Sequence, residues 1–218
     1  TGGKIDSDQT VNIVGYDFKS LDASSESDAE SFTSFAQVYE GLYRENAKHE
    51  IEKAGAESVD VSADNLTYTF HLRKDAKWSD GKPVTAQNYE FSWKRLINPD
   101  NGYDYMELLS MVKNVPEYQA KKTTADQVGI KATDDYTFVV TLSQPTPYFL
   151  NMLSFGCLVP QREDVFTALG KDYGQNWQKM VYNGPFTISN YQKGSNITYK
   201  KNDNYYGAKN VKLAQASC

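Results

Sequence analysis

The chain has few of the residues that build metal centres or disulfide frameworks. Among its 218 residues it has two cysteines, Cys157 and Cys218, and two histidines, His49 and His71. Two cysteines do not make a disulfide scaffold, and neither histidine has a partner at metal-ligand spacing. Cys157 lies in an apolar run and is expected to be a buried hydrophobic residue, whereas Cys218 is either free or a dimer-forming thiol. We predict no metal site and no cofactor.

Several other signals are also missing. The net charge is −5 and no basic patch is present, which argues against nucleic-acid binding. No apolar stretch approaches the ~18–20 residues that span a bilayer. The sequence has no G-x-S-x-G elbow and no phosphate-binding G-x-x-x-x-G-K-[ST] loop, and carboxylate pairs such as Asp134-Asp135 are typical of turns. We therefore predict that the protein is not an enzyme.

Aromatic residues, by contrast, are plentiful at 13%, and sixteen of them are tyrosines, so the chain can form a sizeable core. The clearest pattern lies at 66–72, where apolar and polar residues alternate and predict a half-buried strand. Ser79-Asp80-Gly81 predicts a turn. No internal repeat and no Pro/Gly-rich linker is evident.

A helix is predicted directly after that turn. Thr85 is a suitable N-cap, and from Ala86 the apolar residues recur on one helical face until Asn98-Pro99 ends the helix. Trp93 lies on this face and Trp78 follows the strand, so both tryptophans are expected to be structural.

The rest of the chain mixes strands and helices without regular βαβ alternation, so α+β subdomains are as plausible as an α/β fold. A disordered start is expected over 1–10, and 47–59 shows no clear periodicity. Helices are expected over 29–39, 103–111, 116–120, 147–153 and 163–170. Strands are expected over 10–16, 128–132, 136–142, 186–191 and 197–201.

Residue identities in these segments carry a resemblance. The block LTYTFHLRKDAKWSDGKPVTAQNYEFSWKRLINP at 66–99 resembles the signature of the peptide-binding family of extracellular solute-binding proteins, the receptors of ABC-type oligopeptide importers. Two departures are Ala23, where the family has proline in its L-D-P turn, and Tyr206, where tryptophan is usual; residues 49–52 also depart. Further landmarks resemble the family in the same order, at 11–14, 21–22, 38–43, 134–142, 145–150, 160–161, 182–186 and 204–211.

The resemblance implies a fold and its division. We expect a mixed α/β (α+β) chain that forms the N-terminal lobe of a two-lobed fold like that of periplasmic binding proteins. Residues 1–43 and 148–218 would form an incomplete ligand-lobe core, and 44–147 an inserted α+β subdomain. Family members are much longer, so we interpret this chain as a fragment, a truncated product or a short relative, with the tail 213–218 foreign to the family pattern.

The resemblance also implies a function. The protein would be an extracellular receptor, anchored to the cell surface as a lipoprotein whose export signal has been removed before the polar start at 1–4. It would deliver oligopeptides to a membrane-embedded ABC permease. The alternative is a surface module for signalling or adhesion that has lost the second lobe. The ligand could also be a sugar, a dipeptide or a metal chelate.

Receptors of this family hold a peptide as if adding a strand, through main-chain hydrogen bonds. The matching segment here is Ser27, Asp28, Ala29 and Glu30, whose backbone is the predicted ligand strand. An alternative, which does not exclude the first, is that residues 24–28 form a polar loop with Asp28 as the N-cap of the next helix. The resemblance places the group that binds the peptide's amino terminus in the C-terminal lobe, which we expect to be missing from these 218 residues.

Overall fold

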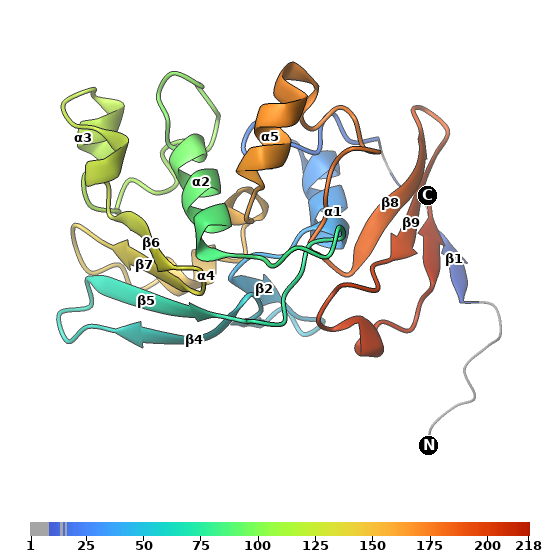
Figure 1. The fold of residues 1–218 in the computed structure, drawn as a ribbon, viewed down its shortest axis with the longest axis horizontal. Coiled ribbons are helices and arrows are strands. Elements are labelled where there is room, and N and C mark those ends of the chain that lie inside the picture. Colours follow the sequence, from blue (N-terminus) through green and yellow to red (C-terminus); the bar gives the residue numbers. More distant parts are fainter. Residues whose placement is uncertain (1–8, 14, 16) are drawn as a thin grey trace.

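The computed structural model describes residues 9–13, 15 and 17–218. Two four-stranded sheets stand side by side, and each packs against helices (Figure 1). The helices are α1 (Ala29–Val38), α2 (Ala86–Leu96), α3 (Val115–Gln119), α4 (Phe149–Met152) and α5 (Glu163–Leu169). The strands are β1 (Thr10–Asn12), β2 (Tyr43–Glu45), β3 (Ile51–Lys53), β4 (Ala56–Val61), β5 (Thr67–Leu72), β6 (Ile130–Asp134), β7 (Thr137–Thr141), β8 (Phe186–Gln192), β9 (Asn196–Lys201) and β10 (Gln215–Ser217). The start at 1–8, which was expected to be disordered, lies outside the described residues, as do positions 14 and 16 of the first predicted strand.

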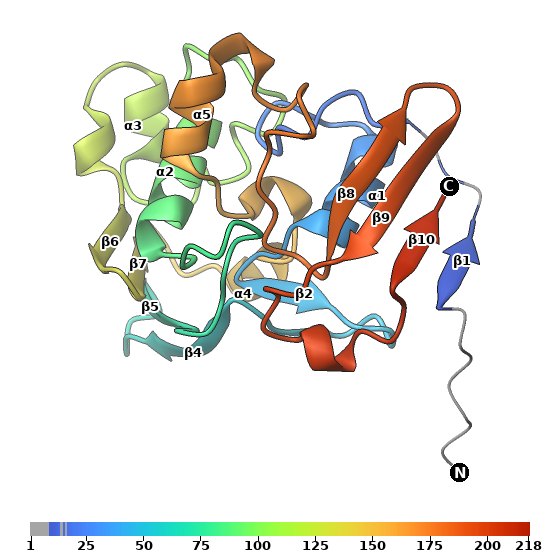
Figure 2. The same cartoon turned by 45° about the vertical axis from the view of Figure 1, so that its right-hand side comes forward.

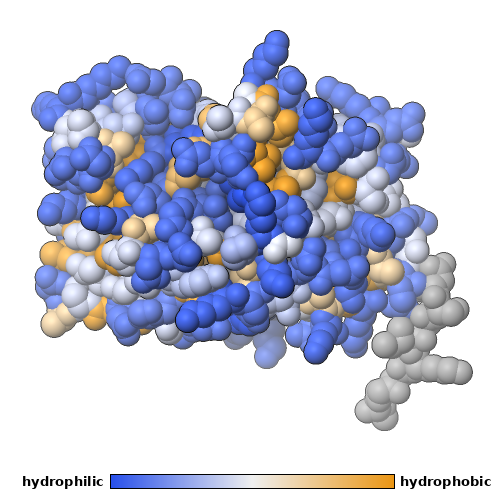
Figure 3. Space-filling view, in the orientation of Figure 1, coloured by the Kyte–Doolittle hydropathy of each residue, from blue (hydrophilic) through white to orange (hydrophobic). Residues whose placement is uncertain are grey.

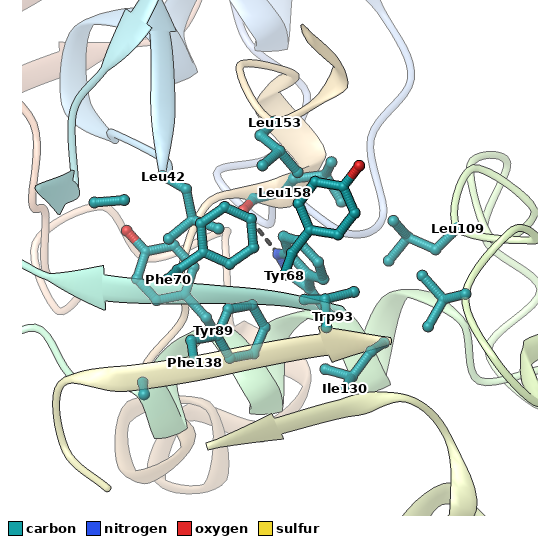
Figure 4. Close-up of a cluster of buried hydrophobic side chains, with 14 of the residues drawn as sticks. Leu42, Tyr68, Phe70, Tyr89, Trp93, Leu109, Ile130, Phe138, Leu153 and Leu158 are labelled. Carbon is teal, nitrogen blue, oxygen red and sulfur yellow. Dashed lines mark hydrogen bonds between the residues drawn. The ribbon is translucent and has the colours of Figure 1, made fainter. Parts of the chain in front are cut away.

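One sheet has the order β4-β5-β7-β6. The alternation predicted over 66–72 is confirmed, because Tyr68, Phe70 and Leu72 of β5 are buried and the positions between them are partly exposed. Phe70 lies opposite Phe138 of β7 in the antiparallel pairing, and cross-strand aromatic pairs stabilise a sheet. Helix α2 packs against β6 and β7 of this sheet (Figure 4).

Helix α2 begins where the sequence predicts. Thr85 is its N-cap, and the Asn88 side-chain oxygen accepts hydrogen bonds from the Thr85 N–H at 2.9 Å and from the indole of Trp78 at 3.0 Å. The indole of Trp93 donates to the Leu158 carbonyl at 2.9 Å (Figure 4). Both tryptophans are buried core residues, as expected.

The other sheet has the order β1-β10-β9-β8. The predicted hairpin is confirmed as β8 and β9, and Gly194 adopts the positive φ of +72° that its turn requires. Strand β10 lies between β9 and β1, antiparallel to the former and parallel to the latter (Figure 2). Helix α1 packs against β8.

Buried hydrophobic residues form two clusters. The α2 cluster draws its members from residues 42–158, and the α1 cluster joins residues 18–39 to residues 159–199. The predicted division at 44 and 147 stays a prediction. Phe149, Leu153 and Leu158 lie beyond position 147 but belong to the α2 cluster, which suggests a direct test of where the boundary falls.

We expect residues 44–147, expressed alone, to unfold in one cooperative transition, and residues 42–158 to do so with a higher midpoint. The longer fragment adds six buried side chains, four of them Leu or Phe, and each buried Leu or Phe contributes about 1.5–3 kcal/mol. Urea unfolding followed by circular dichroism measures this. If only the longer fragment unfolds cooperatively while the shorter one binds ANS, the boundaries move outward; if neither does, the division itself is wrong.

The helix predicted over 103–111 is wrong. These residues form consecutive turns, although Leu109 and the following Val112 are buried. Groups from elsewhere in the chain bind backbone carbonyls of this segment. The Met111 carbonyl accepts from the Ser143 N–H at 2.8 Å, and the Met106 carbonyl accepts from the Gln119 side chain at 2.6 Å. Tertiary hydrogen bonds therefore override the local periodicity here.

Residues 47–59, which show no periodicity, contain β3 and the start of β4. Both strands are largely exposed, since only Ala56 of the two is buried. A strand with little burial needs no alternation of apolar and polar residues, so its sequence gives no signal.

Candidate functional site

The predicted peptide-binding residues lie at the start of α1. Ser27 and Asp28 precede the helix, whereas Ala29 and Glu30 belong to its first turn. Asp28 is the N-cap, and its Oδ1 accepts a hydrogen bond from the Ser31 N–H at 2.9 Å. The capping prediction is therefore confirmed. Because Ala29 and Glu30 are helical, only the residues before them can pair with a ligand as an extended strand, and the assignment of all four to a peptide stays a prediction.

We call residues 24–28 the entry segment, because they lead into α1. Within the described part of the chain, the N–H groups of Glu26 and Ser27 donate to no protein group. The N–H groups of Ala29 and Glu30 have no intrahelical acceptor because they lie in the first turn. Ser27 is exposed and Glu26 is partly exposed. The segment thus offers main-chain donors to a ligand.

A buried ion pair fixes the chain just before these free donors. The guanidinium of Arg95 in α2 donates to Asp22 Oδ1 at 2.6 Å and to Asp22 Oδ2 at 2.5 Å. Their side chains are only 9% and 8% exposed. Gln161 accepts from Arg95 at 2.9 Å and donates to the Ser24 hydroxyl at 2.8 Å. The entry segment is therefore tied to both hydrophobic clusters.

The turns at 103–105 lie beside the entry segment and contact it. The Ser27 hydroxyl donates to the Asp104 carboxylate. Tyr105 packs edge-on against Phe32 of α1, with 5.8 Å between ring centroids. The entry segment consequently lies at the seam between the α1 cluster and the turns of the α2 cluster.

Two carboxyl groups of the entry segment have opposite shifts in pKa. Burial raises the pKa of Glu26, and the charges of Asp28 and Asp22 raise it further. Burial acts on Asp28 in the same direction, but the hydrogen bonds from Ser31 outweigh it and lower the pKa of Asp28 overall. Asp28 therefore remains ionised at neutral pH and keeps its capping hydrogen bond.

Asp28→Ala should lower the free energy of unfolding by about 1 kcal/mol at neutral pH, because it removes an N-cap. The folded pKa of Asp28 lies below its unfolded value. Its contribution is therefore fully present above the unfolded pKa and is lost as the pH falls through the folded pKa. Urea unfolding across this range measures the effect. Asp28→Asn, which keeps a capping oxygen, is the control; equal stability of Asp28→Ala and the parent at neutral pH would contradict the assignment.

A cavity of about 790 Å³ opens beside α1. Aromatic rings, including those of Phe32, Phe35 and Phe155, form one part of its lining. Glu40, Arg44 and their polar neighbours form another part. The cavity gives no local signal in the sequence, because its lining comes from segments far apart in the chain.

The polar part of that lining is a hydrogen-bonded network centred on Glu40, which is 7% exposed. Its carboxylate accepts from the Tyr205 hydroxyl at 2.6 Å, from the Tyr206 hydroxyl, and from Arg44 at 3.2 Å. The guanidinium of Arg73 lies 4.0 Å from the centre of the Tyr206 ring. Residues 40 and 205–206 stood out in the sequence only as landmarks of a resemblance. Here they join the end of α1 to the chain that follows β9.

The described residues hold no group of three or more His, Cys, Asp or Glu side chains that could bind a metal ion. Cys157 is fully buried, as predicted, and burial raises the pKa of its thiol to about 12. Over residues 9–13, 15 and 17–218, every helix is too short or too polar to cross a bilayer. Hydrophilic side chains cover most of the face in Figure 3, with small hydrophobic patches between them.

Comparisons with known proteins identify the family. A profile described as bacterial extracellular solute-binding proteins, family 5, middle, matches residues 50–217. The chain belongs to this family. That family consists of solute-binding proteins and not of enzymes, and the tail at 213–217 lies within its match, so the expectation that the tail is foreign to the family pattern is wrong.

Three similar proteins show the extent of the likeness. The dipeptide-binding protein of Lactococcus lactis subsp. cremoris is 37% identical over 98% of this chain and 40% of its own length. Listeria monocytogenes OppA bound to peptide has a TM-score of 0.93 at 37% identity, over 97% of this chain and 42% of that one. The substrate-binding domain of a Bacillus anthracis oligopeptide ABC transporter has a TM-score of 0.95 at 35% identity, over 99% of this chain and 42% of that one.

The chain therefore has the mixed α/β fold of one part of these receptors, consistent with a single lobe. It spans about two fifths of the length of these relatives.

Proposed function

We propose that this chain is the N-terminal lobe of a receptor that binds oligopeptides outside the cell and delivers them to a membrane-embedded ABC permease. The proposal is supported by the Lactococcus lactis relative, which is named a dipeptide-binding protein, and by the Listeria monocytogenes structure, which has peptide bound. Anchoring by a lipid at the cell surface is part of the same proposal and rests on the family resemblance.

The single observation that supports peptide binding here is the set of free main-chain donors on an anchored segment. Glu26 and Ser27 carry N–H groups without protein partners, and Asp22 and Ser24 fix the chain just before them. A peptide laid along this segment would pair a carbonyl group with one of these two donors, because successive N–H groups of an extended segment face opposite sides. Because all peptides share the same backbone, such pairing tolerates many side chains, and water fills the remaining space.

A test uses a form of the protein that carries a second lobe. Ser27→Pro removes the Ser27 N–H and should weaken binding of a mixed tripeptide library in isothermal titration, since proline has no donor. Ser27→Ala keeps that N–H and should bind as the parent does. Circular dichroism and urea unfolding of Ser27→Pro against Ser27→Ala check that the proline leaves the fold intact.

Equal binding by Ser27→Pro and Ser27→Ala would contradict main-chain pairing at this position.

The length of the reading frame is a second test. A frame that continues past the codon for Cys218 with a second lobe agrees with a transport receptor. A frame that stops there agrees instead with a surface module for signalling or adhesion.

A further inference from the structure

We propose that Arg95 is a positioning residue that holds the entry segment in place for its ligand, an inference that rests on the proposed peptide-binding function. Arg95 lies in α2, outside the segment itself. Its neighbour Leu96 is completely buried in the α2 cluster. Arg95 therefore extends from a helix that is packed firmly in the core. Its guanidinium pairs with Asp22, which lies between Leu21 and Ala23 of the α1 cluster.

Aromatic rings surround the guanidinium of Arg95. The guanidinium lies 4.3 Å from the ring centre of Phe166, 5.3 Å from that of Tyr103 and 5.4 Å from that of Tyr173. The Tyr103 hydroxyl accepts a hydrogen bond from Arg95 at 2.6 Å. A charge buried in this way is tolerated only with a well-placed partner. The position of Asp22 is therefore strongly constrained by Arg95.

Two hydrogen-bonded routes run from Arg95 to Ser24. In one, Asp22 Oδ1 accepts from Arg95 and also from the Ser24 N–H at 3.1 Å. In the other, Gln161 accepts from Arg95 and donates to the Ser24 hydroxyl. Ser24 lies two residues before Glu26, whose N–H is the first of the free donors. Both routes begin at the guanidinium, so its loss breaks the first hydrogen bond of each. The start of the entry segment should then become more mobile.

Arg162 provides a matched comparison. Its side chain is 6% exposed, and it pairs with Asp80 at 3.0 Å and with Asp164 at 2.6 Å. It makes no ion pair or hydrogen bond with residues 22–28 among the described contacts. Replacing either arginine by methionine removes a buried guanidinium, but only the change at Arg95 affects the two routes to Ser24.

The test measures amide hydrogen exchange by NMR on the whole 218-residue chain. We expect Arg95→Met to speed exchange of the Ser24 amide by about tenfold or more relative to Arg162→Met, because local opening then requires no broken ion pair. The exchange rates of the β5 amides should be the same in the two variants. Equal exchange at Ser24 in both variants would overturn the inference.

Ser24→Ala keeps the test decisive if Arg95→Met does not fold. It removes only the hydroxyl that Gln161 contacts, so exchange of the amide at position 24, corrected for the intrinsic rate of alanine, should rise by a smaller factor, and no rise at all would also overturn the inference. A separate arm titrates the mixed tripeptide library into the two-lobed form, where Arg95→Met should weaken binding and Arg162→Met should not. If the parent binds no peptide, the proposed function fails, whereas the exchange rates still decide the role of Arg95.

Discussion

Trp93→Ala should lower the free energy of unfolding by about 3–5 kcal/mol, the range for truncating a fully buried large aromatic side chain. Trp93 has no exposed surface. Its ring packs edge-on against Phe138 with 5.0 Å between centroids, and its indole donates to the Leu158 carbonyl. The substitution therefore leaves a cavity in the α2 cluster and an unpaired carbonyl beside it. Urea unfolding followed by circular dichroism measures the loss.

Trp177→Ala is the matched control, because Trp177 is only partly buried against the α1 cluster. Trp177→Ala should lower the free energy of unfolding clearly less than Trp93→Ala does. Near-parent stability of Trp93→Ala, or equal losses at the two positions, would contradict the assignment of Trp93 to the centre of the core.

Residues 1–218 alone should show no measurable peptide affinity, whereas a form with a second lobe should bind peptides. The entry segment can contact only the side of a peptide that faces it, so the rest of a bound peptide would stay in water. A net gain of about 1 kcal/mol per hydrogen bond does not offset the freedom that an associating ligand loses. Isothermal titration with the mixed tripeptide library measures both proteins under the same conditions.

The same titration has a clear opposing outcome. Micromolar or tighter binding by residues 1–218 would show that the ligand site lies wholly within this lobe. The two-lobed account would then be wrong, and the cavity beside α1 would become the first place to look for the ligand.

Sequence patterns predicted those elements whose local preference agrees with their tertiary environment. Strand β5 alternates buried and partly exposed residues, and helix α2 is amphipathic with a capped start, so periodicity identified both. The turns at 103–111 have helical spacing, yet their backbone groups are taken by Ser143 and by the Gln119 side chain. Strands β3 and β4 are too exposed to show a pattern. Strand β10 was missed because only its long-range pairing with β1 and β9 makes it a strand.

The candidate site was predictable in part. The sequence predicted the capping role of Asp28, since a polar residue followed by a helical pattern is a local signal. It could not show that Arg95 and Asp22 meet, because the two residues are far apart in the chain and each resembles an ordinary surface charge. The network around Glu40 was missed for the same reason, since its partners come from positions near 40 and near 205.

The most direct test of the central claim is amide exchange at Glu26 and Ser27 in the two-lobed form, with and without a saturating tripeptide mixture. Main-chain pairing predicts that bound peptide slows exchange of at least one of these two amides, neither of which donates to a protein group in the unbound lobe. Peptide binding shown by titration with no slowing at Glu26 and Ser27 would contradict the claim that this segment is the ligand strand.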